Sequence, residues 1–299
     1  MQNDFLLSCE STVDMPYEYV SSRGISVLFY SYMVDGVEYP DDMLRDPDAL
    51  PRFYGFIADG KVPSTSQINV FKYTEYFEDL IAKGNKTILH IAMGSGMSPS
   101  VNNAKEAAAK LNEKYPDVNI IVIDSYCSSS GYGLYVDTAA DVRDAGGSLD
   151  DVLAWLKAHD RTTHHLFFTD NFKYFKRSGR VSGAAAALGT MLSICPMMHL
   201  DYGGRMYAYD KVRGKKNAIR KTVEQMLLHA ENGKDYNGKC FISHANCIDT
   251  AEEVRLAVEE SFPQLAGKIR TYDIGTIISS HCGPGTTAVY FFGDERVQH

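Results

Sequence analysis

Two consecutive strand–loop–helix units constrain the fold of this chain more than any other feature. The segments 87–93 (TILHIAM) and 118–124 (VNIIVID) are apolar on both faces, and each leads into a loop of small polar residues. A helix is expected after each loop, over about 101–115 and 132–144, and Ser98-Pro99 marks the start of the first. Strands that are apolar on both faces are typical of parallel sheets covered by helices. The sequence therefore predicts an α/β fold built on a parallel sheet.

Length and a change of pattern predict two domains. The 299 residues are about twice a common domain length of roughly 150 residues. A helical pattern ends near residue 159, and the chain beyond it mixes strands, helices and a predicted hairpin around 201–204. We expect an N-terminal parallel-sheet α/β domain over residues 1–160 and a C-terminal mixed α/β domain over residues 161–299.

Charge and cysteine usage exclude several classes of protein. Lys and Arg number 30 and Asp and Glu 38, which gives a net charge of −8 without a basic stripe. Nucleic acid is therefore not an expected partner, because phosphate backbones are bound by Lys and Arg. No stretch approaches the ~20 apolar residues that cross a bilayer, and the first residues have no basic flank or long apolar run of a secretory signal. The six cysteines form no C-x-x-C pair, so we expect reduced thiols and a cytoplasmic location.

Nucleotide-binding motifs occur only in incomplete forms. The segment 55–62 (GFIADGKV) resembles a phosphate-binding loop, but Val62 replaces the hydroxyl that would hold magnesium. Its Gly60 is better explained as the residue that ends a helix. The loop 94–96 follows a strand and precedes a helix, yet Pro99 replaces the third glycine of a dinucleotide fingerprint. This loop therefore predicts an anion site at a helix N-terminus and nothing more specific.

A metal site is not expected from the spacing of potential ligands. Cysteine and histidine residues recur in the last sixty or so positions, at Cys240, His244, Cys247, His281 and Cys282. These spacings fit no standard pair of short chelating loops, and several of these residues fall in strand-like runs. Buried strand residues explain them better.

Four segments carry more hydroxyl and glycine residues than packing requires. They are 10–14 (ESTVD), 63–67 (PSTSQ), 95–98 (SGMS) and 279–285 (SSHCGPG). Each follows a predicted strand end or is placed like one. Turn chemistry explains any one of them. All four together, with a histidine in one, are equally well explained by a converging polar pocket.

In this order the segments resemble the DegV family of bacterial fatty-acid-binding proteins. The matching segments are 10–14, 65–67, 94–100, 178–182, 211–213 and 281–285. The family's Asp-Ser-Thr-x-Asp start is matched with Glu10 for the first Asp, and its His-x-Gly-Pro-Gly signature is intact at 281–285. The resemblance runs over almost the whole chain.

The resemblance implies a non-catalytic protein that holds a long-chain fatty acid between its domains, without a cofactor. A separate ATP-dependent fatty acid kinase is the implied partner, to which the carboxylate is presented for acyl-phosphate formation. The acyl chain is expected in the C-terminal domain. The implied carboxylate-binding residues are Thr65, Ser66, Ser95, Gly96 and His281. Hydroxyls and helix N-terminal amides would supply the donors that such a carboxylate needs.

Two arginines and one small-residue segment have competing explanations. By resemblance, Arg213 lies near the head group or its covering loop, and Arg180 helps the kinase to dock. Solvated surface arginines are an equally good account of both. The segment 182–189 (SGAAAALG) suits one wall of an alkyl tunnel or tight helix packing equally well.

A function of another class stays open on the sequence alone. A serine-dependent hydrolase or acyl-transfer enzyme could use Ser95 as nucleophile and His281 as base. No G-x-S-x-G nucleophile elbow supports it.

Overall fold

The computed structural model describes residues 4–183 and 193–299, whose strands form three sheets. The first sheet has the order β2-β1-β6-β7 and is parallel throughout. Its strands are β1 (Leu6–Glu10), β2 (Ile25–Leu28), β6 (Thr87–Ala92) and β7 (Asn119–Asp124). The parallel sheet predicted from the two apolar segments is confirmed, although β7 lies at the sheet edge and is only partly buried.

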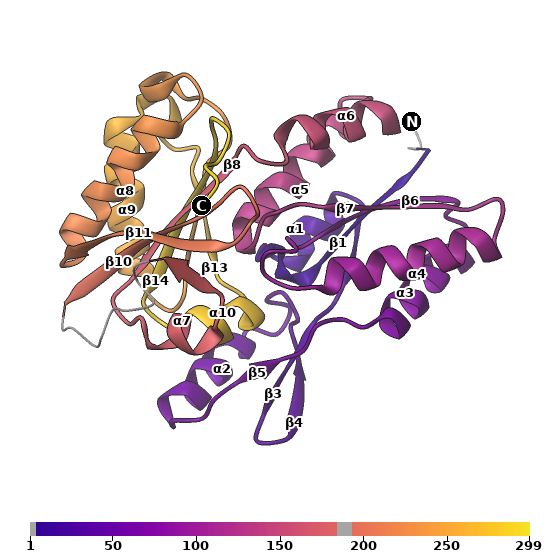
Figure 1. Ribbon diagram of the computed structural model, residues 1–299, viewed down its shortest axis with the longest axis horizontal. Helices are drawn as coiled ribbons and strands as arrows, with labels where there is room; N and C mark the ends of the chain where they lie inside the picture. The colour runs from indigo at the N-terminus through magenta and orange to yellow at the C-terminus, as the bar shows by residue number, and fades with distance from the viewer. Residues whose placement is uncertain (1–3, 184–192) are drawn as a thin grey trace.

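Helices cover both faces of this sheet, as predicted (Figure 1). α5 (Ser129–Asp144) and α6 (Leu149–His159) lie on one face, and α3 (Val70–Ala82) and α4 (Ser100–Lys114) lie on the other. The apolar spacing of α4 produces its buried face, which includes Ala104, Ala107, Ala108 and Leu111. Shorter elements at this end of the chain are η1 (Ser11–Val13) and α1 (Tyr17–Ser22).

The second sheet is mixed and has the order β13-β12-β14-β8-β10-β11-β9. Its strands are β8 (Thr163–Thr169), β9 (Val181–Gly183), β10 (Ile194–Leu200), β11 (Met206–Arg213), β12 (Phe241–His244), β13 (Arg270–Asp273) and β14 (Thr286–Phe292). β10 and β11 form the predicted hairpin. Packed on the sheet are α8 (Lys215–His229) and α9 (Ile248–Ser261). Two further 3-10 helices are η3 (Gly233–Asp235) and η4 (Pro263–Leu265). The mixed α/β character expected of the C-terminal half is confirmed.

The chain passes from the first sheet to the second between Asp124 and Thr163. Within this stretch, α5 packs on η1 and also contacts β8, β12 and β14 of the second sheet. The change of sheet brackets the boundary predicted near residue 160. The division into domains 1–160 and 161–299 itself stays a prediction.

A small third sheet, β4-β3-β5, extends from the N-terminal half. It consists of β3 (Ser31–Val34), β4 (Val37–Pro40) and β5 (Ser64–Thr65), and α2 (Ala49–Ala58) lies between the last two in sequence. The run 25–33 (ISVLFYSYM) reads as one strand in the sequence. That prediction is wrong, because its two halves are β2 and β3, in different sheets. The chain leaves the first sheet after Leu28, and the backbone N–H of Tyr30 donates to the Ser11 hydroxyl instead of a neighbouring strand.

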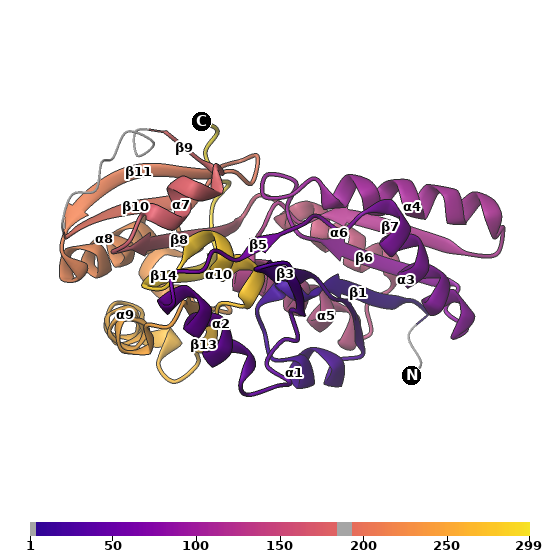
Figure 2. The same ribbon diagram turned by 90° about the horizontal axis from the view of Figure 1, so that it is seen from below.

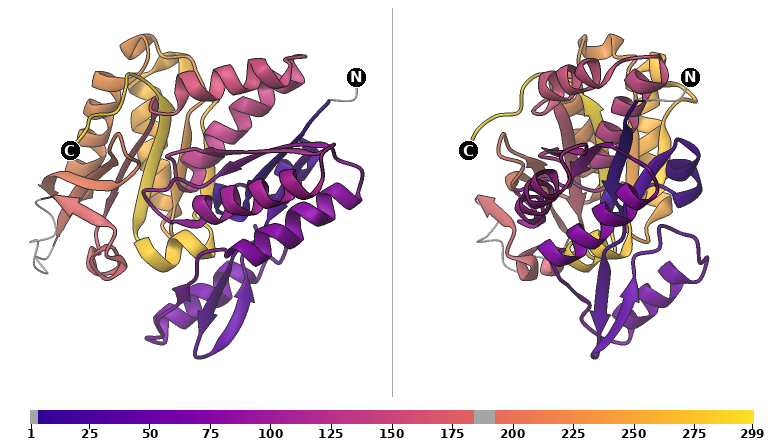
Figure 3. Two further views of the ribbon diagram at one scale, coloured as in Figure 1. Left: turned by 45° about the vertical axis from the view of Figure 1, so that its right-hand side comes forward. Right: turned by 90° about the vertical axis from the view of Figure 1, so that its right-hand side faces the viewer.

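α10 (Thr276–Cys282) ties the C-terminal half to the third sheet (Figures 2 and 3). It contacts β3 and β5 and also α7 (Lys173–Ser178). Residues 279–282, expected after a strand, thus form the end of a helix, and Gly283 follows with a φ of 71°. Among the helices of the described residues, none has the length and hydropathy needed to span a bilayer.

Candidate ligand-binding site

A cavity of about 350 Å³ lies where loops of the first sheet meet the third sheet, the second sheet and α10. This volume falls in the range of small-molecule sites. Its apolar wall includes Met93, Met97, Phe167, Phe175, Leu200, Met206, Ile274, Ile277, Ile278 and Ala288. Polar lining residues include Tyr30, Thr65, Ser66, Gln67, Ser98, Ser128, Ser129, His165, Arg180 and His281. The cavity is therefore mostly apolar, with a limited set of polar groups.

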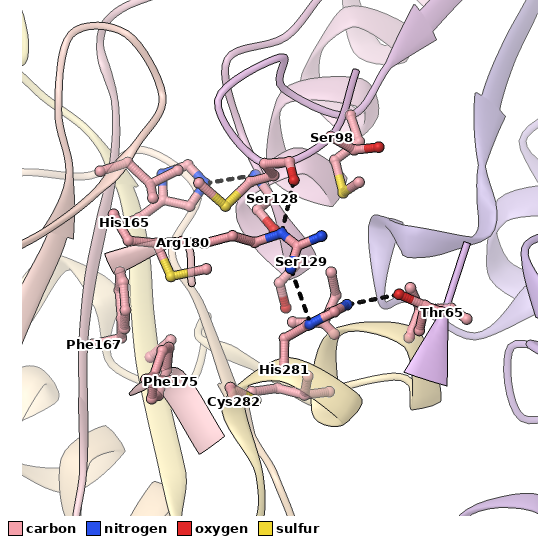
Figure 4. A pocket seen from close by; sticks show the side chains of 18 of the residues that line it. Thr65, Ser98, Ser128, Ser129, His165, Phe167, Phe175, Arg180, His281 and Cys282 are labelled. Carbon is pink, nitrogen blue, oxygen red and sulfur yellow. Dashed lines mark hydrogen bonds between the residues drawn. The ribbon is translucent and has the colours of Figure 1, made fainter. Parts of the chain in front are cut away.

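His281 links two of these polar groups (Figure 4). Its Nε2 lies 2.7 Å from Oγ1 of Thr65, and its Nδ1 lies 3.3 Å from Nη1 of Arg180. A guanidinium only donates hydrogen bonds, so Nδ1 accepts from Arg180 and Nε2 carries the proton of the neutral ring. Nε2 then donates to Thr65, and the hydroxyl proton of Thr65 is left for a ligand.

The electrostatics of His281 agree with this arrangement. Burial, with the positive charges of Arg180 and Arg177, lowers the pKa of His281 to about 4. The ring is therefore neutral at neutral pH, as the hydrogen-bond pattern requires.

Ser98 presents a second hydroxyl at the N-terminal end of α4. Its Oγ accepts from the backbone N–H of Ser100 at 3.3 Å and lies 2.9 Å from the Ser100 hydroxyl. The Ser100 hydroxyl accepts from the backbone N–H of Ile68, so its own proton can be donated to Ser98. The Ser98 proton is then left for a ligand, next to the positive end of a helix dipole that favours anions.

Arg180 is held in place by backbone carbonyls. Its Nε donates to the carbonyl of Met97 and its Nη1 to that of Ser178, both at 2.9 Å. Burial lowers its pKa, but a guanidinium remains charged at neutral pH. Among the described lining residues Arg180 is the only Lys or Arg, and none is Asp or Glu. The lining therefore suits a ligand with a single negative charge.

Tyr30 contributes a hydroxyl that lacks a partner. The residue lines the cavity, and its buried hydroxyl has no hydrogen-bond partner within the described parts of the chain. Burial raises the pKa of Tyr30 well above its ordinary range, so it keeps its proton. An unsatisfied buried donor costs about 1–3 kcal/mol, which a ligand oxygen in reach would recover.

The structure corrects the placement of Ser95 and Gly96. Ser95 is exposed and lies outside the cavity lining, and its backbone N–H donates to Asp124. Gly96 also lies outside the lining: a Cβ there would be 2.3 Å from the carbonyl oxygen of Gly204. Glycine is therefore needed for the close approach of two loops. Ser98 supplies the lining hydroxyl from this loop, and its place directly before Pro99 is the sequence signal for it.

The other predicted residues divide between the cavity and the surface. Thr65, Ser66 and His281 line the cavity together, and so does Arg180, which was expected to serve kinase docking. Arg213 is exposed at the end of β11 and lies outside the lining. Of the small-residue segment 182–189, residues 184–189 lie outside the described residues.

The hydrolase alternative requires a contact that the structure does not make. Both ring nitrogens of His281 are engaged, one by Thr65 and the other by Arg180. Ser95 lies outside the cavity that His281 lines. The proposed nucleophile and base are therefore not brought together.

The segment 10–14 lies behind the cavity. The buried carboxylate of Glu10 accepts from the backbone N–H of Met93 at 3.0 Å and from the Tyr73 hydroxyl. The Asp14 carboxylate accepts from the Ser129 hydroxyl at 2.5 Å. Met93 and Ser129 line the cavity, so these two acidic residues hold lining residues in position.

Fold and site together define an α/β protein with two large sheets and a mostly apolar, anion-accepting cavity. Residues 6–294 match the family model described as "Uncharacterised protein, DegV family". The chain belongs to the DegV family. A DegV domain-containing protein of Clostridium perfringens is 33% identical over 293 residues, which cover 98% of each chain.

Solved structures with the same fold include proteins described by their ligands. A DegV family protein from Thermus thermophilus, described for its fatty acid binding, has a TM-score of 0.84 and 24% identity over 97% of this chain and 99% of its own. A DegV lipid binding protein from Thermotoga maritima has a TM-score of 0.82 and 24% identity over 98% and 99%. A stearic acid-binding protein from Eubacterium ventriosum has a TM-score of 0.84 and 21% identity over 98% of each chain. At these identities the likeness confirms the fold.

Proposed function

We propose that this chain binds a long-chain fatty acid in the cavity between its two large sheets. The observation that carries the proposal is a mostly apolar cavity whose lining holds hydroxyl donors and one arginine, with no acidic residue among the described lining residues. The fatty-acid and lipid binding described for structural neighbours supports it.

The carboxylate is held by hydrogen-bond donors and one positive charge. Thr65 and Ser98 each have a hydroxyl proton to donate, because their oxygens accept from His281 and from Ser100. Arg180 supplies the opposite charge beside them. Hydrogen bonds to a charged group contribute about 1.5–3 kcal/mol each, so this end fixes the orientation of the ligand.

The acyl chain contributes the larger part of the affinity. It lies against apolar side chains of the second sheet and α10, such as Phe167, Ile277 and Ala288. Each buried methylene contributes about 0.8 kcal/mol, so a sixteen-carbon chain gains up to ~12 kcal/mol before the costs of association.

The bound carboxylate is presented in the cytoplasm to a separate ATP-dependent fatty acid kinase, which forms the acyl phosphate. One carboxylate oxygen keeps a lone pair that attacks the γ-phosphorus of ATP, while the bond from that phosphorus to the β–γ bridging oxygen breaks and ADP leaves. Arg180 is placed to face the charge of the transferred phosphoryl group. With such a kinase added, Arg180→Met lowers acyl-phosphate formation at saturating fatty acid, whereas Arg213→Met on the exposed end of β11 leaves it unchanged.

Titration of delipidated protein with three ligands tests the binding step. Palmitate is expected to bind tightly, and octanoate much more weakly because it buries eight fewer methylenes. Methyl palmitate keeps the chain and loses the charge, and we expect at least tenfold weaker binding than palmitate. Equal affinity for palmitate and its methyl ester would contradict the assigned carboxylate site. Equal affinity for palmitate and octanoate would contradict burial of the acyl chain against the apolar wall of the cavity.

A further inference from the structure

His164, His229 and Asp294 meet in the C-terminal half, outside the lining of the cavity. We infer that these three side chains form a binding site for a divalent transition metal of the zinc class. The site does not depend on the proposed fatty-acid function.

The ligand atoms are already close to the separations that such a metal requires. One nitrogen of each histidine and a carboxylate oxygen of Asp294 all lie within 4.8 Å of one another. Oδ1 of Asp294 is 3.0 Å from Nε2 of His164 and 3.1 Å from Nδ1 of His229. Tetrahedral zinc, with bonds of about 2.0–2.2 Å, places neighbouring ligand atoms about 3.3 Å apart. The two nitrogen–oxygen separations therefore lie within a few tenths of an ångström of the value that the ion requires.

Three different elements hold these side chains together through their backbone. His164 lies on β8, His229 is the last residue of α8, and Asp294 follows β14. The backbone N–H of Asp294 donates to the carbonyl of His229 at 3.0 Å, and that of Gly293 donates to the carbonyl of Thr162 at 2.9 Å. The ligands are thus positioned before any ion arrives.

Gly293 permits this convergence. A Cβ at position 293 would lie 2.1 Å from the carbonyl oxygen of His229 and 3.0 Å from Cδ2 of His164. Only glycine lets the end of β14 approach both histidine residues this closely.

The burial and exposure of the side chains suit metal binding. His164 is buried, and imidazole nitrogens are among the commonest metal ligands in proteins. Its ring stacks on Phe291 and on His229, with centroids 5.1 Å apart in both pairs. The Asp294 side chain is 59% exposed and that of His229 is 23% exposed. The ion can therefore enter from solvent, and water can complete its coordination as in zinc sites with three protein ligands.

Hydrogen bonding is the competing explanation: Nε2 of His164 lies 2.9 Å from the backbone carbonyl oxygen of Asp294, and both histidines face the Asp294 carboxylate. Metal binding would replace these hydrogen bonds. When the ion is bound, His164 carries its proton on Nδ1 and His229 on Nε2, which frees the nitrogens that face Asp294. Both imidazoles stay neutral, so the exchange needs only a change of tautomer.

The test is a titration of untagged protein, stripped with a chelator, with Zn²⁺ by calorimetry and with Co²⁺ by visible absorption. One ion per chain is expected to bind and to raise the melting temperature. His229→Ala and Asp294→Asn are expected to lower the affinity at least tenfold and to abolish the rise in melting temperature. Asp294→Asn keeps the size of the side chain and one acceptor oxygen, so we expect the fold to be retained.

His299→Ala is the matched control. His299 belongs to a different histidine pair, with Nε2 3.0 Å from that of His199, and its removal is expected to leave the affinity unchanged. Absence of saturable binding overturns the inference, and so does wild-type affinity in both His229→Ala and Asp294→Asn. Loss of binding in His299→Ala alone would place the ion at the other pair and would also overturn it.

Discussion

Oγ1 of Thr65 and Nε2 of His281 lie 2.7 Å apart, although 216 positions separate the two residues in the chain. Thr65 belongs to the third sheet and His281 to α10, so this contact joins the N-terminal half to the C-terminal half within the lining of the cavity. Because His281 donates its proton to Thr65, the hydroxyl of Thr65 is oriented to donate to a ligand.

Removing the Thr65 hydroxyl is expected to weaken fatty-acid binding about tenfold. Thr65→Val keeps the shape but loses one hydrogen bond to the carboxylate, which is worth roughly 1.5 kcal/mol at the low end for a charged acceptor. Thr65→Ser retains the hydroxyl and is expected to bind within about threefold of the wild type. Dissociation constants for palmitate, measured by calorimetry, check this. Similar constants for Thr65→Val and the wild type would contradict the role of the hydroxyl.

Two serines of one loop provide a matched pair. Ser98→Ala is expected to raise the dissociation constant about tenfold, because the Ser98 hydroxyl lines the cavity. Ser95→Ala, three positions away and exposed, is expected to have no effect. Competition with a fluorescent fatty acid measures both. Weaker binding by Ser95→Ala than by Ser98→Ala would instead support Ser95 as the carboxylate-binding residue, as predicted from the sequence.

The free energy of unfolding is expected to decrease as the pH is lowered, in part because of His281. Its pKa of about 4 in the folded protein lies below the ordinary value near 6.5, so the unfolded chain takes up the proton first. The contribution of the neutral ring is complete above pH 6.5 and is lost as the pH falls toward 4, by about 2 kcal/mol at pH 5. Urea unfolding at pH 7.5 and pH 5 measures it. Between pH 7.5 and pH 5, the free energy of unfolding of His281→Asn should decrease by about 2 kcal/mol less than that of the wild type. Equal decreases in the two proteins would contradict the lowered pKa of His281.

Gly96 is expected to be required for packing. Gly96→Ala would place a Cβ 2.3 Å from the carbonyl oxygen of Gly204, and such overpacking costs about 1–3 kcal/mol. Gly55→Ala in α2 is the control, because a Cβ there meets nothing within 4 Å, and alanine stabilises a helix by up to ~1 kcal/mol relative to glycine. Denaturant unfolding of both variants checks the prediction. An unchanged free energy of unfolding in Gly96→Ala would show that the loops of Gly96 and Gly204 can move apart.

The spacing of apolar residues was sufficient to predict the strands and helices that bury a continuous apolar run or one apolar face. The apolar runs of β6 and the face of α4 follow from spacing alone, and the buried residues of both confirm it. The strand predicted over 25–33 was wrong: pairing with β1 stops at Leu28, and the backbone N–H of Tyr30 donates instead to the Ser11 hydroxyl, from another part of the chain. Local sequence does not contain that contact.

The sequence predicted which loops form the site, but it did not predict which side chain of each loop faces the cavity. Ser95 and Ser98 share one loop, and only the approach of Gly96 to Gly204 decides which hydroxyl faces the cavity. The same limit applies to the cluster of His164, His229 and Asp294. His229 lies 65 positions and His164 130 positions before Asp294 in the chain, so no short motif indicates the cluster.

Mass spectrometry of the purified protein tests the central claim most directly. The untagged chain, expressed in bacteria and measured first in its native state and then after lipid extraction, is expected to carry close to one long-chain fatty acid per molecule. A variant that combines Thr65→Val with Ser98→Ala is expected to retain much less. Recovery of the chain free of lipid, together with no binding of added palmitate, would contradict the account.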